Sequence, residues 1–277
     1  VEFADLALVI IDEQHRFGVH QRLMLREKGE KAGFYPHQLI MTATPIPRTL
    51  AMTVYADLDT SIIDELPPGR TPITTVVISE ERRDEIVARV KNACINEKRQ
   101  AYWVCTLIDE SEVLEAQAAE AIWVDLTKAL PMLKIGLVHG RMKPQEKQDI
   151  MAAFKNAELD LLVATTVIEV GVDVPNASLM IIENAERLGL SQLHQLRGRV
   201  GRGSTASFCV LMYKPPLGKV SQKRLQVLRD SQDGFVISEK DLEIRGPGEV
   251  LGTKQTGIAE FKVANLMRDR KMIPTVQ

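Results

Sequence analysis

Two arginines set among glycines are the residues of this chain best suited to chemistry. Arg199 and Arg202 lie three positions apart in the sequence Gln195-Leu196-Arg197-Gly198-Arg199-Val200-Gly201-Arg202, where the glycines let the backbone come close to a ligand. No Asp or Glu occurs between Arg187 and Arg229, so neither arginine has an acidic neighbour in sequence. Guanidinium groups grip phosphate oxygens, and an arginine placed on a transferring phosphoryl group can raise its rate by about 10³–10⁵.

An acid pair follows the first apolar run of the chain. Asp12 and Glu13 come directly after residues 6–11, a run that predicts a strand buried on both faces of a parallel sheet. In nucleoside triphosphatases an acid at such a strand end holds Mg²⁺, and a neighbouring Glu can deprotonate the attacking water. Taken alone, the pair is equally well explained as polar residues at a strand end.

Hydroxyl groups, glycines and a further carboxylate follow later strands. They suit contacts with phosphate, ribose and the nucleic-acid backbone, although each group alone also fits a simple turn. These candidates are Thr42, Thr44, His139, Arg141, Thr165, Thr166, Gly171 and Asp173.

Strands that alternate with helices predict the frame for these residues. Apolar or β-branched runs at residues 74–78, 101–107, 135–138, 159–164, 179–182 and 208–212 are typical of strands, with helical spacing between several of them. This alternation predicts an α/β fold with a parallel sheet. Pro67-Pro68-Gly69 indicates a linker, so we expect three parts, at residues 1–68, 69–228 and 229–277.

Composition limits the class of protein. The chain has 277 residues and a net charge of −2, which gives no overall attraction to nucleic acid, so any such binding needs a local patch. Cys94, Cys105 and Cys209 form no C-x-x-C pair and predict buried free thiols. The sequence has no signal-peptide pattern and no apolar run near the roughly 20 residues of a membrane span. We therefore expect a cytoplasmic protein without a membrane partner.

In their order, these motifs resemble those of the superfamily-two helicases, in which two RecA-like lobes clamp ATP. Asp12–His15 is similar to their second motif, Thr42–Thr44 to the third, His139–Met142 to the fourth, Thr165–Asp173 to the fifth and Gln195–Arg202 to the sixth. The resemblance implies a parallel-sheet RecA-like helicase lobe of the P-loop NTPase type. A partial first lobe would precede it, and a small helical and turn-rich C-terminal element would follow.

A narrower resemblance is to the RecG family, bacterial ATP-dependent helicases that remodel branched DNA. The sequences Asp12–Gly18, Thr42–Thr49 and Arg245–Gly257 carry it, and the last is similar to the translocation motif of that family. The resemblance implies ATP and Mg²⁺ as cofactors, branched double-stranded DNA (forks and Holliday junctions) as the partner, and replication-fork proteins as further partners.

The same resemblance implies a role for each site residue. Asp12 would serve Mg²⁺, Glu13 the attacking water, and Arg199 and Arg202 the γ-phosphate. Further nucleotide contacts would come from Gln14, His15, Gly171, Asp173 and Gln195. Coupling to nucleic acid would involve Thr42, Thr44, His139, Arg141, Thr165, Thr166, Arg245, Gly246 and Gln255.

One motif of these helicases is missing, because the sequence contains no G-x-x-x-x-G-K-[ST] phosphate loop. We therefore expect that loop and a DNA-binding wedge domain upstream of Val1, no ATP hydrolysis by this chain alone, and exposed sheet surface in the first part, with self-association or N-terminal disorder as a consequence. Two alternatives stay open. One is the motor of a transcription-repair coupling translocase, although Gln14 and the Gly-Pro-Gly-Glu sequence favour RecG. The other is a non-catalytic module that binds DNA or a partner.

Overall fold

A computed structural model describes residues 6–12, 24, 28, 34–42, 59, 61–63, 65, 70–106, 112–165 and 174–245. The chain divides into two compact units, residues 1–45 and 46–277. Most residues between 43 and 69 lie outside the described ranges. The boundaries predicted after residues 68 and 228 therefore stay predictions.

The first unit contains two parallel strands, β1 (Leu8–Ile11) and β2 (His37–Ile40). Val9 and Ile11 are buried, whereas Leu8 and Ile10 are 53% and 57% exposed. The prediction that this strand is buried on both faces is therefore wrong, because alternate side chains point to opposite faces and only one face is covered. The expected exposure of sheet surface in this part is confirmed.

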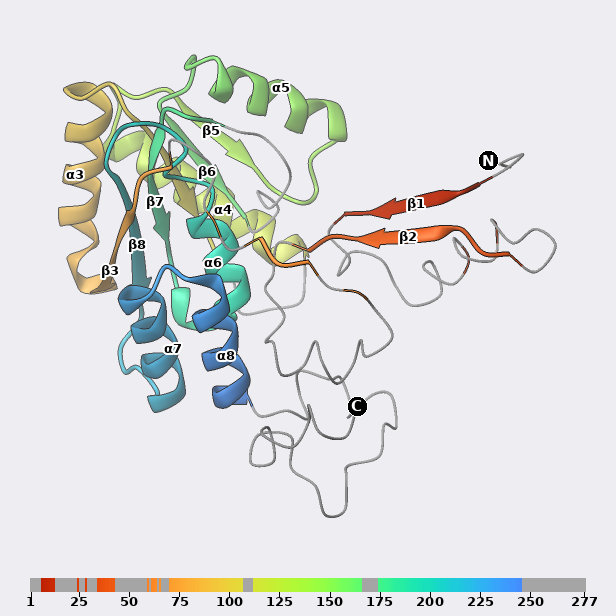
Figure 1. The fold of residues 1–277 in the computed structure, drawn as a ribbon. Helices are drawn as coiled ribbons and strands as arrows, with labels where there is room; N and C mark the ends of the chain where they lie inside the picture. Colours follow the sequence, from red (N-terminus) through yellow and green to blue (C-terminus); the bar gives the residue numbers. More distant parts are fainter. Residues whose placement is uncertain are drawn as a thin grey trace. The chain divides into compact units, whose positions relative to one another are not determined.

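The second unit is built on a six-stranded parallel sheet, shown in Figure 1. Its spatial order is β3-β8-β7-β4-β6-β5, and every neighbouring pair is parallel. The strands are β3 (Ile73–Ser79), β4 (Gln100–Val104), β5 (Ile135–Val138), β6 (Leu161–Ala164), β7 (Ala177–Ile182) and β8 (Ser207–Tyr213). The prediction of an α/β fold with a parallel sheet is confirmed.

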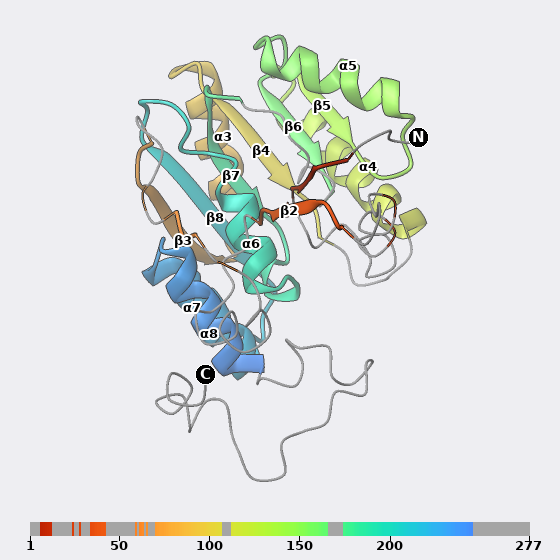
Figure 2. The same ribbon diagram turned by 45° about the vertical axis from the view of Figure 1, so that its right-hand side comes forward.

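Helices cover both faces of this sheet (Figures 1 and 2). They are α3 (Arg83–Ile95), α4 (Glu112–Ala129), α5 (Pro144–Lys155), α6 (Leu190–Arg197), α7 (Lys219–Asp230) and α8 (Gly234–Arg245), with short 3₁₀ turns η2 (Glu80–Arg82) and η4 (Ala185–Arg187). One core packs α3 and α4 against the sheet, and a second core packs α5, α6, α7 and α8 against the other face. Strand β4 shows how one sequence serves both cores, because Trp103 belongs to the first, and Tyr102 and Val104 belong to the second.

The three cysteines lie inside this unit as free thiols, which confirms the sequence prediction. Burial raises the pKa of Cys94 and of Cys209 to about 12, so both thiols are protonated and unreactive at neutral pH. Within the described ranges, no helix combines the length and apolar character needed to cross a bilayer.

Candidate nucleotide and nucleic-acid sites

Helix α6 carries the predicted arginines to the amino ends of the strands. Leu190, Leu193 and Leu196 are completely buried, and this apolar stripe fixes which face of the helix packs on the sheet. The helix ends at Arg197. Residues 198–205 follow it, and we call them the arginine loop.

Two glycines of the arginine loop are required by close packing. Gly201 has a φ of +77°, and a Cβ there would lie 2.8 Å from Cγ1 of Ile73. A Cβ on Gly203 would lie 2.6 Å from the carbonyl oxygen of Pro175. The sequence suggested glycines that admit a ligand, but at these two positions they admit other parts of the same chain. They fix the loop beside the residues that lead into β3 and β7.

The structure brings three of the predicted nucleotide residues together on this short segment. Gln195 lies half-buried on the last turn of α6, Arg199 is half-buried, and Arg202 is exposed. Arg202 donates from Nε to the carbonyl oxygen of Gly198 at 3.3 Å. A half-buried and an exposed guanidinium on one loop form a group that can bind an anion such as a phosphate.

Arg197 has a different role from its neighbours, and sequence reasoning did not single it out. It is 2% exposed, and its Nη1 donates to the carbonyl oxygens of Leu228 at 2.6 Å and Ser231 at 2.8 Å. Burial lowers its pKa, and the cation caps carbonyls at the carboxyl end of α7. The spacing Leu193 to Arg197 was the available signal, because it places Arg197 one turn along the buried face.

His194 completes this buried group. Its Nδ1 lies 3.0 Å from Nη2 of Arg197. Burial lowers the pKa of His194 to about 4, and the charges of Arg197 and Arg70 act in the same direction. The ring is therefore neutral at pH 7, and its Nδ1 can accept a hydrogen bond from Arg197.

A second group of predicted residues lies at the opposite ends of the strands, which are their carboxyl ends. His139 follows β5 and Thr165 follows β6, and the amide of Thr165 donates to the carbonyl oxygen of Val138 at 3.1 Å. Nδ1 of His139 and Oγ1 of Thr165 are buried and have no hydrogen-bond partner among the described residues. Buried polar atoms of this kind need a water or a ligand to satisfy them.

Neighbouring groups extend this second group, and we call His139, Thr165 and the neighbours Thr106, Glu120 and Arg141 the carboxyl-end row. Nε2 of His139 lies 3.5 Å from a carboxylate oxygen of Glu120 on α4. Thr106, which follows β4, donates from its hydroxyl to the carbonyl oxygens of Glu183 at 2.6 Å and Asn184 at 3.0 Å. Sequence reasoning missed Thr106, because its position beside Thr165 depends on β4 and β6 pairing. Arg141 is exposed on the turn after β5.

In the first unit the structure brings Asp12 and Thr42 to adjacent strand ends. Both are exposed, and the amide of Met41 donates to the carbonyl oxygen of Ile11 at 2.8 Å. Mg²⁺ is commonly bound by one or two carboxylates together with water and phosphate oxygens, so the carboxylate of Asp12 fits this ion. Among the residues that the structure describes, no group of three or more His, Cys, Asp or Glu side chains could hold a metal ion.

Several predicted site residues lie outside the described ranges. They are Glu13, Gln14, His15, Thr44, Thr166, Gly171, Asp173, Gly246 and Gln255. The backbone of Arg245 ends α8, and its side chain is likewise outside what the structure describes.

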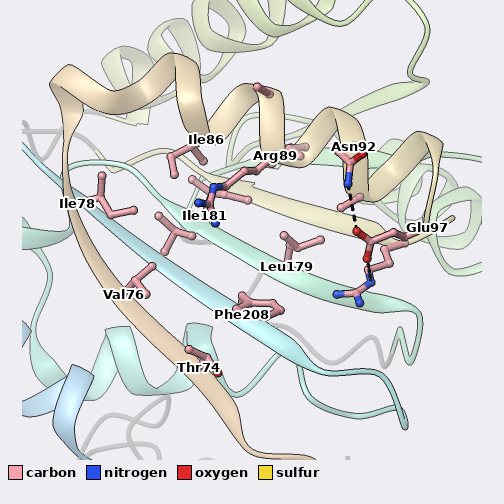
Figure 3. Close-up of a pocket in the computed structure, with 15 residues that line it drawn as sticks. Thr74, Val76, Ile78, Ile86, Arg89, Asn92, Glu97, Leu179, Ile181 and Phe208 are labelled. Atoms are coloured by element: carbon pink, nitrogen blue, oxygen red, sulfur yellow. Dashed lines mark hydrogen bonds and ion pairs between the residues drawn. The ribbon is translucent and has the colours of Figure 1, made fainter.

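An apolar groove of ≈ 630 Å³ lies between α3 and the strands β3, β8 and β7, as Figure 3 shows. Val76, Ile78, Leu179, Ile181 and Phe208 contribute its apolar surface, with Arg89, Asn92 and Glu97 on the helix side. None of the predicted site residues lines the groove. Its mainly aliphatic lining is unsuited to a triphosphate.

The family model "Helicase conserved C-terminal domain" matches residues 78–204, and the model "ATP-dependent DNA helicase RecG, domain 3, C-terminal" matches residues 231–277. The first match includes the carboxyl-end row and most of the arginine loop. The second begins at Ser231, one of the residues whose carbonyl oxygen binds Arg197.

The chain is 95% identical over 277 residues to the ATP-dependent DNA helicase RecG of Haemophilus influenzae and 77% identical to that of Escherichia coli K12. Each match covers 100% of this chain and 40% of the relative. A solved structure of RecG bound to a three-way DNA junction is 43% identical, with a TM-score of 0.72 over 99% of this chain and 34% of that one. The DNA-bound helicase MrfA, 16% identical with a TM-score of 0.62 over 86% of this chain and 36% of that one, shares the fold.

Proposed function

The chain belongs to the RecG family of ATP-dependent DNA helicases, and from this membership we propose that a full-length protein carrying it is an ATP-driven translocase on double-stranded DNA. Its substrates would be branched DNA, with reversal of stalled forks and migration of Holliday junctions as the reactions. The identity to relatives named RecG along the whole of this chain, which covers 40% of each relative, is the observation that supports this most strongly. A bacterial cytoplasmic location and contacts with replication-fork proteins are part of the proposal.

For nucleotide hydrolysis we assign the γ-phosphate to Arg199 and Arg202. The exposed side chain of Arg202 and the packed glycines around it support this role, because a fixed loop presents the guanidinium groups without further ordering. Gln195, Gln14, His15, Gly171 and Asp173 would complete the nucleotide contacts.

We assign Mg²⁺ to Asp12 and the orientation of the attacking water to Glu13. When bound, Mg²⁺ would neutralise charge on the phosphate oxygens. The exposed carboxylate of Asp12, directly after β1, is suited to such a hard cation.

The carboxyl-end row is our candidate for contact with the DNA backbone. His139 and Thr165 each carry a buried polar atom that the described residues leave unsatisfied, and a phosphate oxygen can accept from a hydroxyl or a ring N–H. Arg141, Thr42, Thr44 and Thr166 would act with them. We further propose that Arg245, Gly246 and Gln255 pass the movement of the lobes to the DNA.

The decisive experiment compares ATP hydrolysis by this chain and by the full-length protein, each with no DNA, linear duplex and forked DNA. We expect turnover stimulated by forked DNA in the full-length protein alone, since these 277 residues contain no phosphate-loop sequence. Full-length Arg202→Ala should lose hydrolysis and keep its DNA affinity. Wild-type turnover in that variant would remove the assignment of Arg202, and no turnover in either wild-type protein would refute the proposed activity.

A further inference from the structure

The residues that lead into β3 form hydrogen bonds with the arginine loop along most of the length of that loop. Arg70 donates from Nη2 to the carbonyl oxygen of Gly198 at 2.5 Å. The Thr71 hydroxyl lies 3.3 Å from the carbonyl oxygens of Gly203 and Thr205, between which it divides its single hydrogen. We call residues 70–72 the lead-in segment.

The fit between the two segments is close as well as polar. The amide of Thr71 donates to the carbonyl oxygen of Gly201 at 3.4 Å. The space that a side chain on Gly201 would need is filled by Ile73 and by the carbonyl oxygen of Thr71. At the other end of the loop, the carbonyl oxygen of Gly198 accepts from both Arg70 and Arg202. One backbone carbonyl therefore links the lead-in segment to an arginine assigned to the γ-phosphate.

We propose that Arg70 and Thr71 are positioning residues that hold the arginine loop in the conformation needed for hydrolysis. This inference rests on the proposed function. Catalysis by a guanidinium group depends on its placement, and a shift of about 1 Å can cost on the order of 100-fold in rate.

The same contacts contribute little to folding. They are partly buried or exposed, and a single hydrogen bond of this kind contributes only a small part of the net stability of a domain. Removing one should therefore leave the fold intact while loosening the loop. This difference separates a positioning role from a structural one.

The test uses the full-length protein with Thr71→Val, which removes the hydroxyl and keeps the shape. Thr71→Ser restores the donor, and Thr74→Val is the matched control, because Thr74 is an exposed threonine of β3 that lines the apolar groove. We expect kcat for DNA-stimulated hydrolysis to fall about tenfold in Thr71→Val. KM for ATP and DNA affinity should stay within about twofold, and Thr71→Ser and Thr74→Val should behave like the wild type.

Hydrogen exchange supplies a readout that does not depend on hydrolysis. Amides of the arginine loop should exchange faster in Thr71→Val than in Thr74→Val. Unchanged kcat, unchanged exchange, or equal loss of turnover in Thr71→Ser would each overturn the positioning role. If the wild-type protein hydrolyses no ATP, the proposed function fails by itself, and the exchange of loop amides still decides whether Thr71 holds the loop.

Discussion

Replacement of Arg197 by methionine should destabilise the second unit strongly. The guanidinium group donates to the carbonyl oxygens of Leu228 and Ser231, and its Nη1 also lies 3.4 Å from the hydroxyl of Thr75. Methionine fills a similar volume, but it leaves the buried carbonyl of Leu228 and the partly buried carbonyl of Ser231 without this donor. Each unsatisfied group costs about 1–3 kcal/mol, and the lost cation at the end of α7 adds about 0.3–1 kcal/mol.

Part of this loss is offset, because the Arg197→Met variant no longer buries the charge whose burial lowers the pKa of the arginine. We therefore expect the free energy of unfolding to fall by roughly 2–4 kcal/mol, a large fraction of the 5–15 kcal/mol typical of a domain. With an m-value of roughly 2 kcal/mol per molar urea, the unfolding midpoint should fall by about 1–2 M.

Urea unfolding of this chain, followed by tryptophan fluorescence, measures the effect. Both tryptophans, Trp103 and Trp123, belong to the second unit, so the signal reports its unfolding. Arg202→Ala is the matched control and should change the unfolding free energy by less than about 0.5 kcal/mol, because Arg202 is exposed. An Arg197→Met midpoint equal to that of the wild type would refute the capping role of this residue.

Three further predictions concern Gly201, His194 and Thr165. Gly201→Ala should cost roughly 1–3 kcal/mol of stability, because its φ of +77° and the Ile73 contact oppose a side chain, whereas Gly218→Ala, with nothing within 4 Å, should be nearly neutral in thermal unfolding. Burial lowers the pKa of His194 to about 4, so as the pH falls the unfolded chain binds this proton before the folded chain does. The stability that the neutral His194 contributes is therefore complete above about pH 6.5 and is lost towards pH 4. About 2 kcal/mol should be gone by pH 5, and a His194→Gln variant with the same pH dependence as the wild type would contradict this. Thr165→Val should stabilise the chain by about 1 kcal/mol, because it removes a buried unsatisfied hydroxyl, yet lower DNA-stimulated turnover of the full-length protein; a loss of stability would show that the hydroxyl already has a partner.

Local patterns in the sequence were sufficient for the fold class of the second unit. Apolar runs alternating with helical spacing predicted a parallel sheet, because a strand buried on both faces needs apolar residues at nearly every position. The same logic failed for residues 6–11, where Leu8 and Ile10 are exposed. An apolar run shows that a strand can be buried on both faces, but burial itself also requires a layer packed on each face.

The sequence by itself determined the order of the motifs, the family resemblance and the arginine-rich loop, because these depend on residue types at short spacing. The tertiary structure decided which arginine is buried and which is exposed. Arg197 is buried because carbonyls from the end of α7, 31 and 34 residues away, converge on it, whereas Arg202 stays exposed. The tertiary structure also brings the lead-in segment, which lies 128 to 134 residues earlier in the sequence, against the arginine loop through the pairing of β3 with β8. Contacts at such separations arise from strand order, which short-range patterns do not encode.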